Sequence, residues 1–103
     1  MNDDAQLGGQ RALIDACLKN GVPFLWCTPG TMLIRIIGLP DVLHEVVAAG
    51  HEILGLEGFD LQVDGYHVPR LDLIYDRGSC GETAFEALAK WPANVWVDVT
   101  LTE

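Results

Sequence analysis

Apolar residues recur at helical spacing in two long stretches of the chain, residues 4–20 and 40–49. Each stretch is followed by a glycine, Gly21 or Gly50, a residue that commonly ends helices. The second stretch begins with Pro40, whose fixed backbone angle suits the first position of a helix. We therefore expect both stretches to be helical.

A third helix is expected at residues 80–91. Ser79 and Glu82 have the spacing of a capping box, in which each side chain bonds to the backbone N–H of the other residue. Pro92 would end the helix, because proline lacks the N–H that the next turn needs.

The centre of the chain has the pattern of a β-hairpin. Residues 53–62 and 66–75 read as strands, and they flank Asp64-Gly65, a dipeptide typical of the two-residue type I′ turn. Pro69 inside the second strand indicates an edge position or a bulge. Two glycines inside the first strand indicate a bulge or a close backbone approach, and they are Gly55 and Gly58.

Two further strands complete the predicted sheet. Residues 22–27 are short and rich in aromatic side chains, whereas residues 95–101 alternate strictly between apolar and other side chains. That alternation indicates a half-buried antiparallel strand, which we place at a sheet edge. Residues 32–37 fit either a strand or a short helix. The prediction is a single α+β domain over residues 1–103, with about three helices on a small, mainly antiparallel sheet.

The net charge of the protein excludes two classes of binding partner. The net charge is −9 over 103 residues, with only six lysines and arginines. Nucleic-acid surfaces need clustered basic residues, and anionic membranes repel an acidic protein, so we expect neither partner. The sequence does not predict the oligomeric state.

The cysteines and the N-terminus favour the cytoplasm. Cys17, Cys27 and Cys80 are an odd number without CxxC spacing, which suits a reducing compartment better than a disulfide framework. The first residues are acidic and polar, unlike a signal peptide, and no apolar run is long enough to span a membrane.

One long stretch, residues 36–69, contains six carboxylates and no lysine or arginine. Such a surface attracts cationic ligands by long-range steering. Like charges crowded on one hairpin also cost stability, a cost that a cationic partner would relieve. The carboxylates are Asp41, Glu45, Glu52, Glu57, Asp60 and Asp64.

Motifs for catalysis or metal binding are weak. His44 and His51 each precede a glutamate, but neither HExxH nor paired CxxC spacing occurs. Glu57 could form an acid–base pair with Asp60 or Asp72, although such pairs are expected by chance in so acidic a chain. We expect no catalytic residues, no metal and no cofactor. Whether Cys27 or Cys80 is reactive stays open.

Residues 53–76 resemble small acidic immunity proteins of bacterial polymorphic toxin systems. The shared pattern is the strand LGLEGF, residues 54–59, a turn, and then a strand with Pro69, Leu71, Asp72, Ile74 and Asp76. The resemblance implies a non-enzymatic antitoxin that binds a cognate toxin domain and occludes its active site or an exosite.

The expected contact residues combine carboxylates with aromatic anchors, as protein–protein hot spots often do. The acids would pair with basic toxin side chains. The residues are Glu57, Asp60, Asp64, Tyr66, Asp72, Asp76 and Trp96. Two alternatives stay open: a phage-type acidic inhibitor that mimics nucleic acid, and a small enzyme or metal protein that uses the histidines or cysteines.

Overall fold

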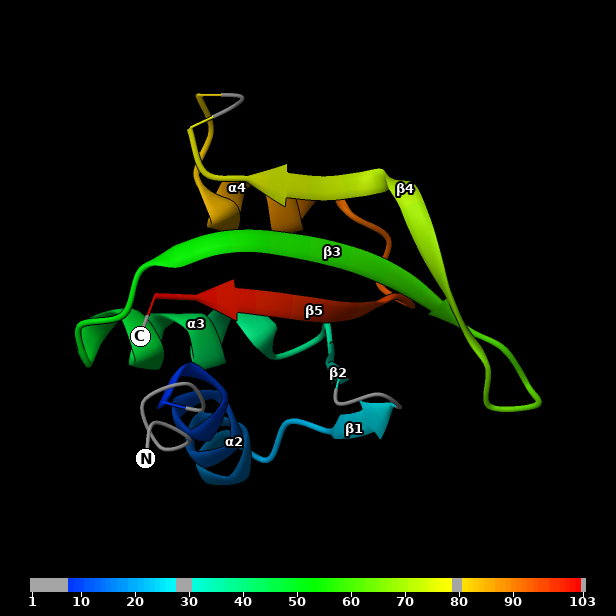
Figure 1. The fold of residues 1–103 in the computed structure, drawn as a ribbon, viewed down its shortest axis with the longest axis horizontal. Helices are drawn as coiled ribbons and strands as arrows, with labels where there is room; N and C mark the ends of the chain where they lie inside the picture. Colours follow the sequence, from blue (N-terminus) through cyan, green and yellow to red (C-terminus); the bar gives the residue numbers. More distant parts are fainter. Residues whose placement is uncertain (1–7, 28–30, 79–80, 103) are drawn as a thin grey trace, which may run out of the picture.

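The computed structural model describes residues 8–27, 31–78 and 81–102. Within these residues the chain forms three helices and five strands, which confirms the α+β class (Figure 1). Their order is α2 (Gly8–Asn20), β1 (Phe24–Cys27), β2 (Thr31–Arg35), α3 (Leu39–Ala48), β3 (Ile53–Leu61), β4 (His67–Asp76), α4 (Ala84–Lys90) and β5 (Trp96–Leu101).

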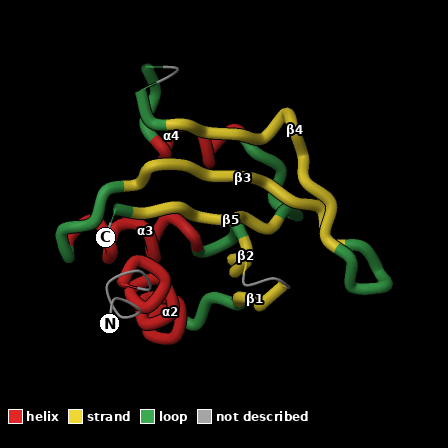
Figure 2. The backbone as a smooth tube through the Cα atoms, in the orientation of Figure 1, coloured by secondary structure: helices red, strands yellow, loops and turns green. Residues whose placement is uncertain are grey.

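The strands form one sheet in the order β1-β2-β5-β3-β4, and every neighbouring pair is antiparallel (Figure 2). Strand β5 lies in the centre, so the expected edge position of residues 95–101 is wrong. Strict alternation of apolar and other side chains indicates that one face of a strand is buried. It does not indicate whether other strands pair with it on one edge or on both. The ambiguous residues 32–37 contribute mainly to a strand, β2.

All three helices cover the same face of the sheet. Their buried side chains share one hydrophobic core with alternate residues of the strands, such as Met32 and Ile34 of β2 or Val97 and Val99 of β5. The opposite face, here called the second face, carries no helix among the described residues. None of the described helices is long and apolar enough to cross a membrane.

A bulge bends the β3–β4 hairpin. Glu57 pairs with Ile74, but the next residue, Gly58, pairs with Arg70, so residues 71–73 have no partner on β3. The bend is visible where β4 turns a corner in Figure 1. Leu73 from this bulge lies directly over Gly58, where a Cβ atom would be only 2.8 Å from the Leu73 Cβ.

Strand β4 is an edge strand, as Pro69 indicated. The Gln62 N–H donates to the Tyr66 carbonyl, so Gln62 and Tyr66 are a hydrogen-bonded pair of the hairpin. In an antiparallel hairpin every second pair of opposite residues is hydrogen-bonded in this way. The Phe59–Pro69 pair falls between those bonds. The nitrogen of Pro69 therefore faces the free edge, where a missing N–H breaks no hydrogen bond within the sheet.

The hairpin turn differs from the predicted type. A type I′ turn needs positive φ at both central residues, but only Gly65 has positive φ, at 90°, and no described residue other than glycine does. The Gly65 N–H donates to the Gln62 carbonyl at 2.9 Å. Residues 63–65 thus form a three-residue loop, in which Gly65 takes the left-handed position after a tight turn.

The third helix starts later than predicted. Its N-cap is Thr83, which forms a capping box with Glu86, and the helix runs over Ala84–Lys90. The sequence contains two successive capping patterns, residues 79–82 and 83–86, and the later one starts the helix. Ser79 and Cys80 lie outside the described residues, as do residues 4–7 of the first predicted helix.

The close approach of Leu73 to Gly58 predicts a specific sensitivity. Gly58→Ala should lower the free energy of unfolding by about 1–3 kcal/mol, because the new methyl group overlaps Leu73. Gly55→Ala is the matched control on the same strand, since its Cβ would meet only the Tyr75 carbonyl oxygen at 3.4 Å. Chemical denaturation of both variants measures the difference, and equal losses would contradict this account.

Candidate functional site

Exposed hydrophobic side chains gather on the hairpin. Ten large hydrophobic residues are exposed in the described chain, and five of them lie between residues 63 and 74. We call these five the hairpin patch: Val63, Tyr66, Val68, Leu71 and Ile74. Leu71 is 82% exposed because the bulge turns it outward, away from the core that Leu73 enters. These side chains surround the hairpin and do not share one face of the sheet. Val68 is opposite Asp60 on the same face as the helices, whereas Ile74 is opposite Glu57 on the second face. Several exposed apolar side chains on one hairpin are typical of an interaction surface.

Two of the predicted contact acids have an internal partner. Arg70 donates from Nε and Nη2 to the two carboxylate oxygens of Asp72, both at 3.0 Å, and from Nη1 to Asp60 Oδ1 at 3.2 Å. The Arg70 guanidinium therefore links Asp72 in the bulge to Asp60 on β3. Its hydrogen bonds to Asp72 hold the pKa of that carboxyl below its ordinary value.

Glu57 lies in a different environment on the second face. Cross-strand pairing places it between Asp98 of β5 and Ile74 of β4, and Asp98 is in turn opposite Leu33 of β2. Leu33 is 0% exposed although it lies on this face. Burial raises the pKa of Asp98, and the nearby Glu57 charge raises it further. This carboxylate pair has no basic partner among the described residues.

Trp96 is half-buried rather than fully accessible. It is opposite Arg35 on one side and Phe59 on the other. Phe59 is buried, and its ring packs edge-on against His67 with centroids 5.4 Å apart. Trp96 therefore borders a small apolar cluster of the second face and lies apart from the turn that carries Tyr66.

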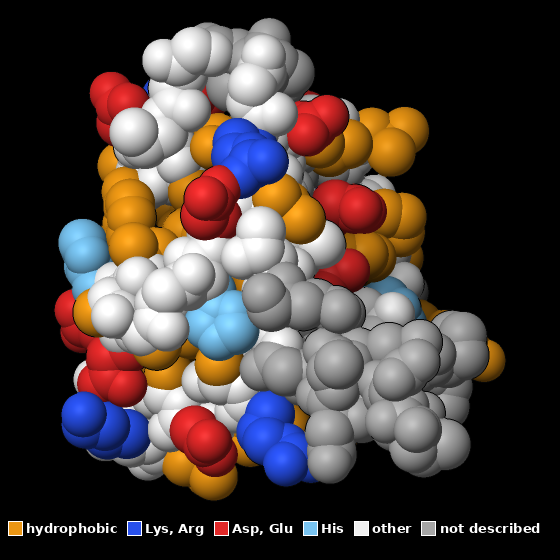
Figure 3. Space-filling model, turned by 60° about the vertical axis from the view of Figure 1, so that its left-hand side comes forward, with side chains coloured by type: hydrophobic (Ala, Val, Ile, Leu, Met, Phe, Trp, Pro, Cys, Tyr) orange, Lys and Arg blue, Asp and Glu red, His pale blue; other side chains and the backbone are white. Residues whose placement is uncertain are grey.

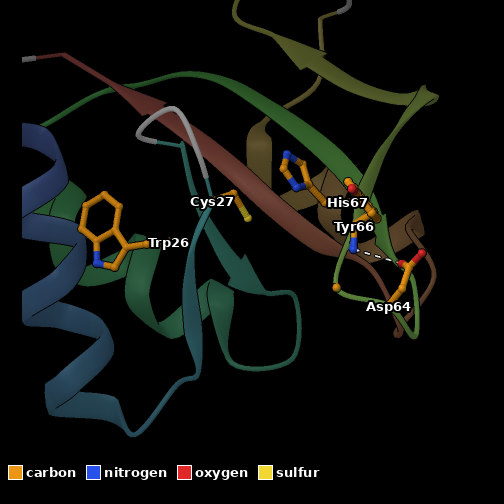
Figure 4. Close-up of a pocket in the computed structure, with 6 residues that line it drawn as sticks. Trp26, Cys27, Asp64, Tyr66 and His67 are labelled. Carbon is orange, nitrogen blue, oxygen red and sulfur yellow. Dashed lines mark hydrogen bonds between the residues drawn. The ribbon is translucent and has the colours of Figure 1, made fainter.

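A hollow, here called the turn pocket, lies between β1 and the turn of the hairpin (Figure 4). Its volume is about 420 Å³, and it is lined by residues 26–27 and 64–67. In Figure 4 the side chains of Cys27 and His67 extend toward the space between β1 and the hairpin. Asp64 accepts a hydrogen bond from the Tyr66 N–H at 3.2 Å, which fixes the carboxylate against the turn.

Three other described acids, Glu45, Glu52 and Glu82, form ion pairs with basic side chains. Glu52 pairs with Arg77, and Glu45 lies 3.3 Å from Lys19. In Figure 3 the blue side chains have red ones beside them, whereas several red side chains at the upper right lie among orange ones. Asp76, the last predicted contact residue, is exposed at the end of β4 opposite Gly55.

The histidines and cysteines have structural surroundings. The His44 ring stacks on Phe85 with centroids 4.2 Å apart, and His51 Nδ1 lies 2.9 Å from the Thr102 carbonyl oxygen. Burial raises the pKa of the Cys17 thiol to about 11, whereas Cys27 is half-buried. Within residues 8–27, 31–78 and 81–102, no three His, Cys, Asp or Glu side chains are grouped to hold a metal ion.

Comparison with protein-family models, curated proteins and solved structures finds no match.

Sequence reasoning missed three contributors to this surface. Arg70 immediately follows the stretch without bases, and its pairing with Asp60 depends on the bulge. Asp98 shares the face of Trp96 by simple alternation, so its position was predictable, but its pairing with Glu57 required the strand order. Trp26 borders the turn pocket only through the tertiary fold.

The raised pKa of Asp98 predicts that this carboxylate destabilises the protein at neutral pH. A carboxyl whose pKa is higher in the folded chain binds protons more tightly there, so protonation favours folding. Asp98→Asn should therefore raise the free energy of unfolding at pH 7. The gain should shrink as the pH falls through the raised pKa and vanish below the ordinary value for aspartate. Glu57→Gln should give a smaller gain, because Glu57 is the lesser cause. A loss of stability in Asp98→Asn at pH 7 would refute this.

A second prediction concerns Arg70. Arg70→Gln should return the pKa of Asp72 toward its ordinary value, because the hydrogen bonds that lower it are lost. The lowered pKa of Asp72 stabilises the folded protein when the pH is above the ordinary pKa of aspartate. That stabilisation is lost as the pH falls through the pKa that Asp72 has in the folded protein. Carboxyl-carbon NMR titration measures the change. Arg77→Gln is the control, since Arg77 pairs with Glu52 and should leave Asp72 unaffected.

Proposed function

We propose that this protein is a non-enzymatic immunity protein, an antitoxin that binds a cognate toxin domain with a basic surface and occludes its active site or an exosite. The observation that carries the proposal is the hairpin patch, whose exposed apolar side chains lie on the same hairpin as the carboxylates Glu57, Asp60, Asp64 and Asp72. Such a surface supplies both the apolar contact area and the charge that a tight complex with a basic protein requires.

The apolar side chains would provide most of the binding energy. Leu71 and Tyr66 are 82% and 71% exposed, and each becomes buried if a partner covers the hairpin. Arg70 holds the bulge that presents Leu71, so the backbone at this contact is fixed before binding. A preordered contact loses less conformational entropy on association than a flexible one.

The carboxylates would determine the partner's charge. Asp60 and Asp72 are already paired with Arg70, so Glu57 and Asp64 are the acids best placed to meet a partner's lysine or arginine. A basic side chain beside Glu57 would also relieve its repulsion with Asp98. The net charge of −9 would speed association through long-range attraction.

We further propose that the protein acts in the cytoplasm, where an immunity protein meets its toxin. The test is co-expression with the toxin-domain protein encoded immediately upstream. We expect restored growth, a 1:1 complex, and an association rate that falls steeply as salt rises. An absent toxin gene, or growth that is not restored, would reject the proposal. Competition by DNA for the same surface would instead indicate a nucleic-acid mimic.

Charge reversal at Glu57 is the sharpest mutational test. Glu57→Lys should weaken toxin binding about tenfold or more, equivalent to roughly 1.4 kcal/mol. The new lysine lies opposite Asp98 and replaces a repulsion with an attraction, so the fold should keep its stability. Asp15→Lys makes the same charge change at an exposed site on α2 and should leave affinity nearly unchanged. Equal effects of the two reversals would show that only net charge matters.

A further inference from the structure

The turn pocket extends the hairpin surface toward a second part of the chain. Residues 26–27 of β1 form one side and residues 64–67 of the hairpin form the other. Its volume of about 420 Å³ lies within the range of ligand-binding clefts. Tyr66 belongs both to the pocket lining and to the hairpin patch, so a partner that contacts Tyr66 also reaches the pocket.

We propose that the turn pocket receives an arginine side chain of the basic partner. The inference rests on the proposed function, because the occupant belongs to the protein that the hairpin binds. Three features of the pocket select this chemistry: a carboxylate without a basic partner, the exposed ring of Tyr66 and a wall held in place by packing.

The carboxylate is Asp64. Its Oδ1 accepts the Tyr66 N–H, which orients the group, while Oδ2 has no hydrogen-bond partner among the described residues. The lining contains no lysine or arginine, and the nearby Arg70 is already paired with Asp60 and Asp72. An arriving guanidinium supplies the missing positive charge and donates to Oδ2.

The aromatic ring of Tyr66 favours arginine over a purely apolar side chain. The Tyr66 ring is 71% exposed, so its face is available to a partner. The Trp26 ring points away from the hairpin in Figure 4 and does not take part. A guanidinium stacks on the Tyr66 face and forms hydrogen bonds in its own plane, which lets it reach Asp64 at the same time. An aliphatic side chain would bury Asp64 without a counter-charge.

The wall of the pocket is held in place by its neighbours. The His67 ring packs edge-on against Phe59, which is itself buried on the second face. On the other side, Cys27 belongs to β1 and pairs with Thr31 of β2. Its thiol and the His67 ring flank the pocket in Figure 4, where the arginine stem would pack.

Backbone and indole N–H shifts in NMR titrations test the proposal with three small probes. The probes are the N-acetyl methylamides of arginine, of citrulline, which is its neutral isostere, and of leucine. We expect the arginine probe to shift the resonances of residues 26–27 and 64–67, and the citrulline and leucine probes to bind at least about tenfold more weakly. The proposal is overturned if the arginine probe shifts none of these resonances, or if either neutral probe binds equally well.

Three variants at two residues assign the contacts. Asp64→Asn should abolish the preference for arginine over citrulline, and Tyr66→Leu should weaken binding of the arginine probe, whereas Tyr66→Phe should retain it. Asp15→Asn, on α2, is the matched control and should bind as the unmodified protein does. Unchanged spectra elsewhere show that each variant keeps its fold. Arginine selectivity that survives Asp64→Asn would exclude Asp64 as the recognition group.

The probe experiment and the toxin experiment fail separately. If the arginine probe does not bind but Glu57→Lys still weakens the toxin complex, the pocket assignment is wrong and the proposed function stands. If the arginine probe binds at the pocket and no toxin binds the protein, the pocket stands and the proposed function is wrong.

Discussion

The contact between Leu73 and Gly58 determines the shape of the hairpin. Because Gly58 has no side chain, Leu73 can turn into the core at a point where β4 leaves the ladder of β3. The strand then continues in a new direction, and the bulge projects Leu71 outward. Without this close approach, residues 71–73 would have to pair normally, and the apolar side chains of the hairpin would be oriented differently.

Electrostatics follow from that geometry. The bulge brings Arg70 next to both Asp60 and Asp72, so part of the acidic hairpin is neutralised from within. Glu57 and Asp98 are instead placed opposite each other without a base, and the pKa of Asp98 is raised. The hairpin surface therefore contains carboxylates that stabilise the fold, Asp60 and Asp72, and carboxylates that destabilise it, Glu57 and Asp98. The destabilising pair is better suited to a cationic partner.

The sequence predicted the elements better than their arrangement. Periodicity located the helices and the hairpin, and Gly58 and Pro69 correctly indicated a bulge and an edge strand. Strand order could not be predicted, because alternation is local, and this left β5 at the wrong position. The pairing of Asp98 with Glu57 depends on that order, whereas the pairing of Arg70 with Asp60 depends on the bulge. Similarly, Leu71 is exposed because it lies in the bulge of residues 71–73, and no sequence pattern predicts how many residues the bulge contains.

The position of Pro69 bears on how the protein behaves at high concentration. Unprotected edge strands invite pairing between copies, which leads to aggregation. On β4, Pro69 removes a donor that would face such a neighbour, and the bulge interrupts the edge a few residues later. The edge therefore offers no long straight run for backbone pairing, although its side chains stay exposed. Backbone pairing between copies along β4 is therefore disfavoured, while the apolar side chains of the hairpin stay exposed.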